Sequence, residues 1–261
     1  MSWKIERQGH VAVVTMDTSH ANLQNVAFEK DLHEAFDRLE SEFVDCSVVL
    51  RGIGQIFSAG VDFDTSLPLF ASGDREAIQD WLERYRMLHL RVFTYPRPTV
   101  AAINGHAFAG GLVLALACDY RLASAGVARI GLNEVPTGIP MPLAYLEIIR
   151  YAIGTQATRL SLFGQVRSAE GALQLGVVHE VVEPDVLQRR AVDVASHVGP
   201  ECFEAYAHSK RVLQAPALDR VERLSERYDG ELPDAVCAPT ALRAQAMAYR
   251  LVKGEEPPWG D

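Results

Sequence analysis

Short apolar strands alternate with amphipathic helices up to about Val182, and no strand pattern follows that residue. The sequence predicts a hairpin over 3–7 and 11–17 and further strands over 47–50, 99–103, 120–123, 127–130 and 177–182. Apolar residues at helical spacing predict helices over 25–43, 74–93, 105–118, 140–152, 155–163 and 168–175. This order favours an α/β fold with a helical C-terminal tail.

Composition and charge narrow the classes of function. Of the 261 residues 48% are apolar, which is typical of a folded globular protein. Lys and Arg total 25 against 34 Asp and Glu, and this net charge of -9 disfavours a general nucleic-acid or membrane binder. We find no signal peptide or membrane span, and the four cysteines lack metal-site spacing. We therefore expect a cytoplasmic protein without a metal.

Two glycine-bearing turns follow two of the predicted strands. The first is Gln55-Ile-Phe-Ser-Ala-Gly-Val-Asp62, and the second, Ala102-Ile-Asn-Gly-His-Ala-Phe-Ala-Gly-Gly111, opens a helix. Glycine permits a close ligand approach, and a helix start leaves backbone N–H groups unpaired. Two such N–H groups converging on one oxygen would form an oxyanion hole. Taken alone, a glycine turn after a strand is more often structural than functional.

The two turns, with Cys118-Asp-Tyr-Arg121 and Ile130-Gly-Leu-Asn-Glu-Val135 after them, resemble the crotonase superfamily of enoyl-CoA hydratases and isomerases. The resemblance extends from the first hairpin to the helical tail. It implies a spiral of ββα units over 1–183, a helical oligomerisation region over 184–261, and a homotrimer or dimer of trimers. It also implies an acyl-CoA thioester substrate, with no cofactor beyond the CoA that the substrate carries.

By position in these motifs, the resemblance assigns the oxyanion-hole amides to Val61 and Gly110 and a catalytic carboxylate to Glu134. The second glutamate of the family's hydratases corresponds to Val113, which cannot transfer a proton. Burial among apolar neighbours would raise the pKa of Glu134 toward neutrality, although a surface glutamate capping the next helix is the alternative. The substrate-binding positions expected from the same comparison are Ala21, Asn22, Ala59, Asp62, Val113 and Gly138.

A single glutamate is the pattern of the superfamily's Δ3-Δ2-enoyl-CoA isomerases, because one base can remove a proton from C2 and return it at C4. Pro142 occupies the position of the additional aspartate of the dienoyl-CoA isomerases, which disfavours that reaction. A hydratase with one glutamate and a non-catalytic acyl-CoA-binding protein are the alternatives. For His106 and for Asp62, a purely structural role is the alternative. Lys210 and Arg211 of the tail are candidates for holding the CoA phosphates.

Overall fold

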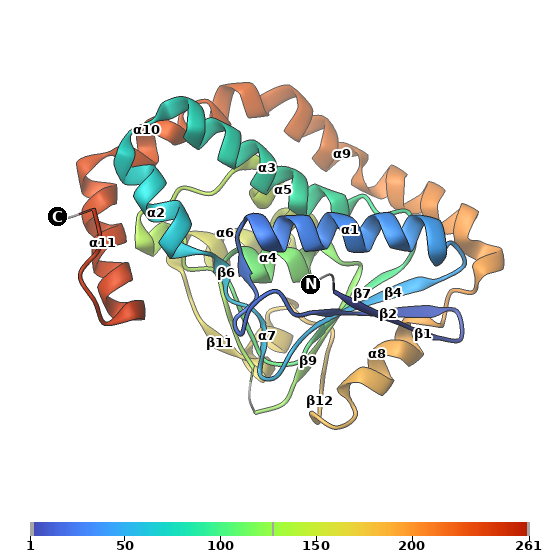
Figure 1. Ribbon diagram of the computed structural model, residues 1–261. Helices are drawn as coiled ribbons and strands as arrows, with labels where there is room; N and C mark the ends of the chain where they lie inside the picture. Colours follow the sequence, from blue (N-terminus) through green and yellow to red (C-terminus); the bar gives the residue numbers. More distant parts are fainter. Residues whose placement is uncertain (1–2, 127, 260–261) are drawn as a thin grey trace.

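The computed structural model describes residues 3–126 and 128–259 (Figure 1). The strands are β1 (Lys4–Gln8), β2 (Val11–Met16), β3 (Leu23–Gln24), β4 (Ser47–Gly52), β5 (Ile56–Ser58), β6 (Gly60–Val61), β7 (Thr99–Ile103), β8 (His106–Phe108), β9 (Tyr120–Ser124), β10 (Arg129–Gly131), β11 (Arg167–Ser168) and β12 (Glu180–Val182). The helices are α1 (Val26–Glu42), α2 (Phe63–Ser72), α3 (Arg75–Phe93), α4 (Gly110–Ala117), α5 (Leu143–Ile153), α6 (Gln156–Phe163), α7 (Ala169–Gln174), α8 (Leu187–Ala195), α9 (Phe203–Asp229), α10 (Leu232–Cys237) and α11 (Pro239–Lys253), with short 3-10 turns η1 (Val135–Thr137) and η2 (Pro200–Cys202).

A six-stranded sheet in the order β1-β2-β4-β7-β9-β12 forms the centre of the fold. Only the β1–β2 pair is antiparallel, and the other four pairs are parallel. Val13, Val49 and Val100 face α8 on one side of this sheet. Val48 and Leu50 face the larger core under α1, α3 and α4 on the other side. Because these strands are covered on both faces, they read as continuous apolar runs.

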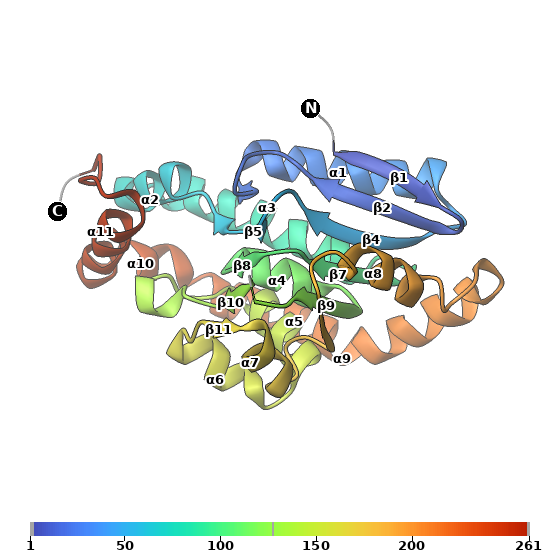
Figure 2. The same ribbon diagram turned by 90° about the horizontal axis from the view of Figure 1, so that it is seen from below.

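A second sheet in the order β11-β10-β8-β5 lies next to the first, and Figure 2 shows its strands beside α4. The long strands β4, β7 and β9 are each followed along the chain by one of its short strands β5, β8 and β10. The strands β4, β7 and β9 lie side by side in the first sheet, and the short strands that follow them, β5, β8 and β10, lie side by side in the same sequence in the second. This stepwise repetition, with a helix after each strand pair, confirms the expected spiral of ββα units.

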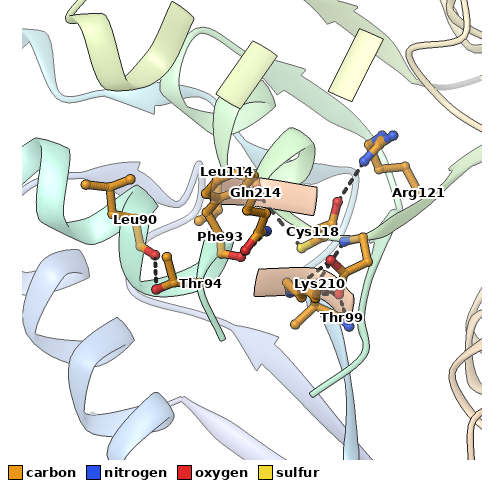
Figure 3. Close-up of polar contacts among 10 residues, drawn as sticks. Leu90, Phe93, Thr94, Thr99, Leu114, Cys118, Arg121, Lys210 and Gln214 are labelled. Carbon is orange, nitrogen blue, oxygen red and sulfur yellow. Dashed lines mark hydrogen bonds and ion pairs between the residues drawn. The ribbon is translucent and has the colours of Figure 1, made fainter. Parts of the chain in front are cut away.

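The C-terminal helix α9 is fastened to the core by buried polar contacts (Figure 3). Lys210 Nζ lies 2.9 Å from the Asp119 carboxylate, which also accepts hydrogen bonds from the amide and hydroxyl of Thr99. Gln214 Nε2 donates to the carbonyl of Phe93 at 2.7 Å. The Lys210 ammonium therefore contributes to the packing of α9, and its expected role in holding a CoA phosphate stays a prediction.

The last helices, α10 and α11, lie at the opposite end of the molecule from the β1–β2 turn (Figures 1 and 2). Both contact α2, and α11 also contacts η1. Leu232 and Val236 of α10 pack with Phe70 of α2 and Ile78 of α3. Lys253 Nζ and the hydroxyl of Tyr249, both on α11, contact the carboxylate of Asp64 at 2.6 and 3.1 Å. The end of the chain is thus packed against the elements that follow the first glycine turn.

The observed elements match most of the expected ones and differ in the short pieces. Helix α2 and the two- and three-residue strands β3, β5, β6, β8 and β11 have no clear sequence signal. The strand expected over 127–130 is β10, and Val127 lies outside the described residues. Within the described part of the chain, none of the helices has the length and apolar character needed to cross a membrane.

Candidate active site

The first glycine turn brings β6 against the start of α4. Gly60 has φ +84, and a Cβ there would lie 2.8 Å from the carbonyl oxygen of Phe108 and 3.0 Å from the amide nitrogen of Gly110. The Asp62 amide donates to the Gln24 carbonyl at 3.3 Å. Because successive backbone amides of a strand point to opposite sides, the Val61 amide points away from β3. A glycine at position 60 is therefore what permits the two turns to meet.

The second turn ends in a strained residue. Ala109, the N-cap of α4, has φ 49 and ψ -132 and provides no side-chain hydrogen bond to the helix. A positive φ outside glycine costs roughly 1–3 kcal/mol and persists where the surroundings impose it. Gly110 follows as the first helical residue, and the first four amides of a helix have no partner within it. The strain at Ala109 thus accompanies an amide without an intrahelical acceptor.

Glu134 lies directly before η1 and is 7% exposed. Neither carboxylate oxygen has a hydrogen-bond partner among the described residues. Burial raises the pKa of Glu134 to about 7. The turn that holds this residue is supported from outside, because Gly138 packs so closely on α11 that a Cβ would lie 2.8 Å from the carbonyl oxygen of Ala241. The alternative of an exposed, capping glutamate is excluded for this residue.

Val61, Gly110 and Glu134 line one cavity of about 30 Å³. Its other polar side chains belong to Tyr85 and Tyr145. Apolar walls are provided by α2, α3, α10 and the segment after η1, through Phe70, Trp81, Leu82, Ile139, Pro140, Pro142 and Val236. The structure therefore brings together the three residues expected to carry the chemistry, in a small and largely apolar space.

The remaining predicted site residues do not line this cavity. Val113 is fully buried in the main core and is not among the lining residues, and its expected position beside the substrate stays a prediction. Ala21 and Ala59 bond to each other, carbonyl to amide, at 3.0 Å. Asn22 has φ 45 and donates to the carbonyls of Met16 and Phe57, which fixes the loop before β3. Asp62 caps α2 by accepting from the Asp64 amide at 3.0 Å.

Aromatic residues of α3 and α5 form the part of the site that sequence reasoning missed. Trp81, Tyr85 and His89 recur every four residues on α3, and Trp81 stacks on Tyr85 with ring centroids 4.7 Å apart. That spacing is a helical signal, but it is equally typical of core packing. Tyr145 comes from α5, and its ring lies 4.5 Å from that of His89. The sequence contains no local signal that brings α3 and α5 together.

A spiral of ββα units that encloses a buried carboxylate beside two glycine turns defines a crotonase-fold enzyme. The chain belongs to the enoyl-CoA hydratase/isomerase family, which matches residues 6–231. It is 36% identical to a Thermus thermophilus protein named as an enoyl-CoA hydratase, over 80% of this chain and 82% of that one. It is 34% identical to the (E)-benzylidenesuccinyl-CoA hydratase of Thauera aromatica, over 74% and 75%.

Solved structures agree with this assignment. The apo enoyl-CoA isomerase of Mycobacterium tuberculosis superposes with a TM-score of 0.76 at 27% identity, covering 91% of this chain and 98% of that one. Human mitochondrial Δ3-Δ2-enoyl-CoA isomerase gives a TM-score of 0.86 over 98% of this chain and all of the other, and at 24% identity it supports the fold alone. The family includes both isomerases and hydratases, so the names do not separate the two reactions.

Proposed function

We propose that this enzyme moves the double bond of an enoyl-CoA thioester from Δ3 to Δ2, with Glu134 as the only acid–base residue. The observation that supports this proposal is the lining of the cavity. Among the described residues, Glu134 is its single carboxylate, and both oxygens lack a partner. Isomerisation needs one base that takes a proton from C2 and returns it at C4. Hydration must in addition hold a water molecule.

The glycine turns complete the proposed mechanism. The amides of Val61 and Gly110 would donate to the thioester oxygen and stabilise the dienolate that forms between the two proton transfers. A base works best when its pKa is near the working pH, and the pKa of Glu134 lies at about 7. The apolar walls would contact the acyl chain. The reaction consumes no cofactor, and we expect it to take place in the reducing cytoplasm.

Hydration of 2-enoyl-CoA is the second candidate, because the curated relatives above carry hydratase names. A binding protein without catalytic activity is less consistent with the site, because an unpaired buried carboxylate costs stability and contributes nothing to binding an apolar acyl chain. The resemblance also places the adenine of CoA at the loop over 21–25, and we propose this loop as the adenine site. Lys210, which pairs with Asp119, and Arg211 stay candidates for the phosphates.

The test is to incubate the full chain separately with 3-hexenoyl-CoA and 2-hexenoyl-CoA and to follow the products by chromatography and mass spectrometry. We expect 3-hexenoyl-CoA to give 2-hexenoyl-CoA, and Glu134→Gln to abolish this conversion. A matched control is Glu83→Gln on α3, because Glu83 is exposed and pairs with Arg86 on the surface. Unchanged 3-hexenoyl-CoA with the wild type, or full conversion by Glu134→Gln, would refute the proposal.

A further inference from the structure

Tyr145 lines the same cavity as Glu134 and takes part in a buried network that ends on the second glycine turn. Its hydroxyl lies 2.8 Å from Nδ1 of His89. Nε2 of His89 lies 2.9 Å from the carbonyl oxygen of Gly110. His89 is fully buried, and burial lowers its pKa to about 4, so the imidazole is neutral at neutral pH.

The partners of His89 determine which nitrogen carries its single proton. Each ring nitrogen lies near a carbonyl that can only accept, Nδ1 near that of Tyr85 and Nε2 near that of Gly110. Nδ1 alone also has a hydroxyl within 3 Å, that of Tyr145, so both nitrogens are paired when Nε2 carries the proton and Nδ1 accepts. The hydroxyl of Tyr145 therefore donates its proton to Nδ1. The Tyr85 carbonyl, 3.0 Å from Nδ1, does not require the Nδ1 proton, because as part of α3 it can accept from the helical amide four residues on. The hydroxyl proton of Tyr145 is thus used in the hydrogen bond to His89, and the hydroxyl oxygen can still accept a hydrogen bond in the cavity.

Tyr85 also takes part in this network, but its hydroxyl has a different hydrogen-bond partner from that of Tyr145. Its hydroxyl donates to Oε1 of Gln24, whose Nε2 donates to the Gly110 carbonyl at 3.1 Å. The hydroxyl also lies 2.2 Å from the place where a Cβ of Gly110 would be, so it packs against the backbone of the turn. Tyr85 therefore supports the turn, whereas Tyr145 approaches the cavity from α5.

The cavity has room for water. A volume of about 30 Å³ exceeds the roughly 10–15 Å³ that one water molecule needs. A water that attacks a double bond carries two protons, and each needs an acceptor to hold the molecule in one orientation. Glu134 can accept one. No second carboxylate lines the cavity among the described residues, so a different group has to accept the other.

We infer that the Tyr145 oxygen is this second acceptor, that it positions a water for hydration of 2-enoyl-CoA, and that His89 is its positioning residue. The inference rests on the proposed site around Glu134. The water oxygen bonds to C3 while one of its protons passes to Glu134. The π electrons move to the thioester oxygen as an enolate held by the Val61 and Gly110 amides. Glu134 then returns the proton to C2, so one water is added and nothing is oxidised.

The test compares Tyr145→Phe with Tyr151→Phe, a matched control on the same helix whose ring packs on Phe93 outside the cavity. Both reactions are followed in each protein, with 2-hexenoyl-CoA for hydration and 3-hexenoyl-CoA for isomerisation. We expect Tyr145→Phe to lose about 10²-fold in hydration, the cost of a misplaced reactant, while isomerisation changes far less. Tyr151→Phe should keep both activities.

Three results would overturn the inference: a wild type that isomerises without hydrating, hydration by Tyr145→Phe at the wild-type rate, or loss of hydration in Tyr85→Phe alone. All three leave the role of Glu134 in isomerisation intact, so this failure is distinguishable from failure of the proposed function.

A second readout concerns His89→Leu. Without its acceptor, the Tyr145 proton should turn toward Glu134, favour the carboxylate and lower the pH midpoint of isomerisation. The double variant His89→Leu/Tyr145→Phe should have the pH midpoint of the wild type. If a folded His89→Leu protein has an unchanged midpoint, this result contradicts the proposed role of His89.

Discussion

The backbone of Gly60 lies directly against the amide of Gly110, with 3.0 Å between a Cβ position on the first and the nitrogen of the second. The two residues are far apart in the chain, and each belongs to a different ββα unit. Their contact brings Val61 and Gly110 to the wall of one cavity. The geometry of the proposed oxyanion hole therefore depends on the absence of a side chain at position 60.

Gly60→Ala should lower the isomerisation kcat by about 10²–10³, the loss typical of one missing oxyanion-hole donor. The added methyl group would meet the Phe108 carbonyl at 2.8 Å and force the turns apart. Gly73→Ala is the control, because Gly73 also has a positive φ but nothing lies within 4 Å of its Cβ position. Steady-state kinetics and melting temperatures are measured for both variants. Equal losses of activity in the two would mean that backbone strain, and not the contact, is responsible.

Glu134→Gln should keep the fold and the affinity for a saturated acyl-CoA while lowering isomerisation by about 10²–10⁴, the range for loss of a general acid–base group. An amide preserves the shape of the side chain but cannot take up a proton from C2. Calorimetric titration with hexanoyl-CoA gives the affinity, and product analysis gives the rate. Retained turnover with unchanged affinity would place the base elsewhere.

The same residue predicts an unusual dependence of stability on pH. Because the pKa of Glu134 rises from 4.5 to about 7 on folding, its contribution to stability is present below pH 4.5 and is lost as the pH rises through about 7. The shift corresponds to roughly 3 kcal/mol. Glu134→Gln should therefore be more stable than the wild type at pH 8, and the difference should shrink at pH 5. Urea unfolding at both pH values measures it, and a difference that grows toward low pH would contradict the assignment.

Much of this architecture follows from local patterns in the sequence, and the rest depends on contacts between distant segments. The apolar strand over 99–103 and the helix over 75–93 have strong periodicity, and both occur almost where expected. Helix α2 was not expected, since it contains Pro68 and is short. The three residues proposed to carry the reaction, Val61, Gly110 and Glu134, were identified through motifs of a known family. Tyr145 and His89 were not linked, because only the packing of α5 on α3 makes them neighbours.

The helical tail leaves apolar side chains exposed, which supports our proposal of a homotrimer or a dimer of trimers. Val212 and Leu213 on α9 are 57% and 66% exposed, and Met247 and Leu251 on α11 are 69% and 88% exposed. Exposed apolar residues grouped on helices are typical of protein interfaces. Light scattering at micromolar concentration should give three or six times the chain mass. A monomer would contradict the proposal, and Leu251→Glu should weaken assembly if α11 takes part.

Val113→Glu is expected to destabilise the enzyme without creating a better hydratase. Val113 has no exposed surface and packs in the same core cluster as Val61, Tyr85 and Tyr145. An unpaired carboxylate in such a place costs several kcal/mol or remains protonated. Val113→Thr, close in shape and uncharged, is the control and should cost much less. Thermal melts and the rate of 2-hexenoyl-CoA hydration are measured for both variants. Faster hydration by a fully stable Val113→Glu protein would show that residue 113 reaches the substrate. In that case the water would be held by Glu134 and a second carboxylate, and not by Glu134 and Tyr145.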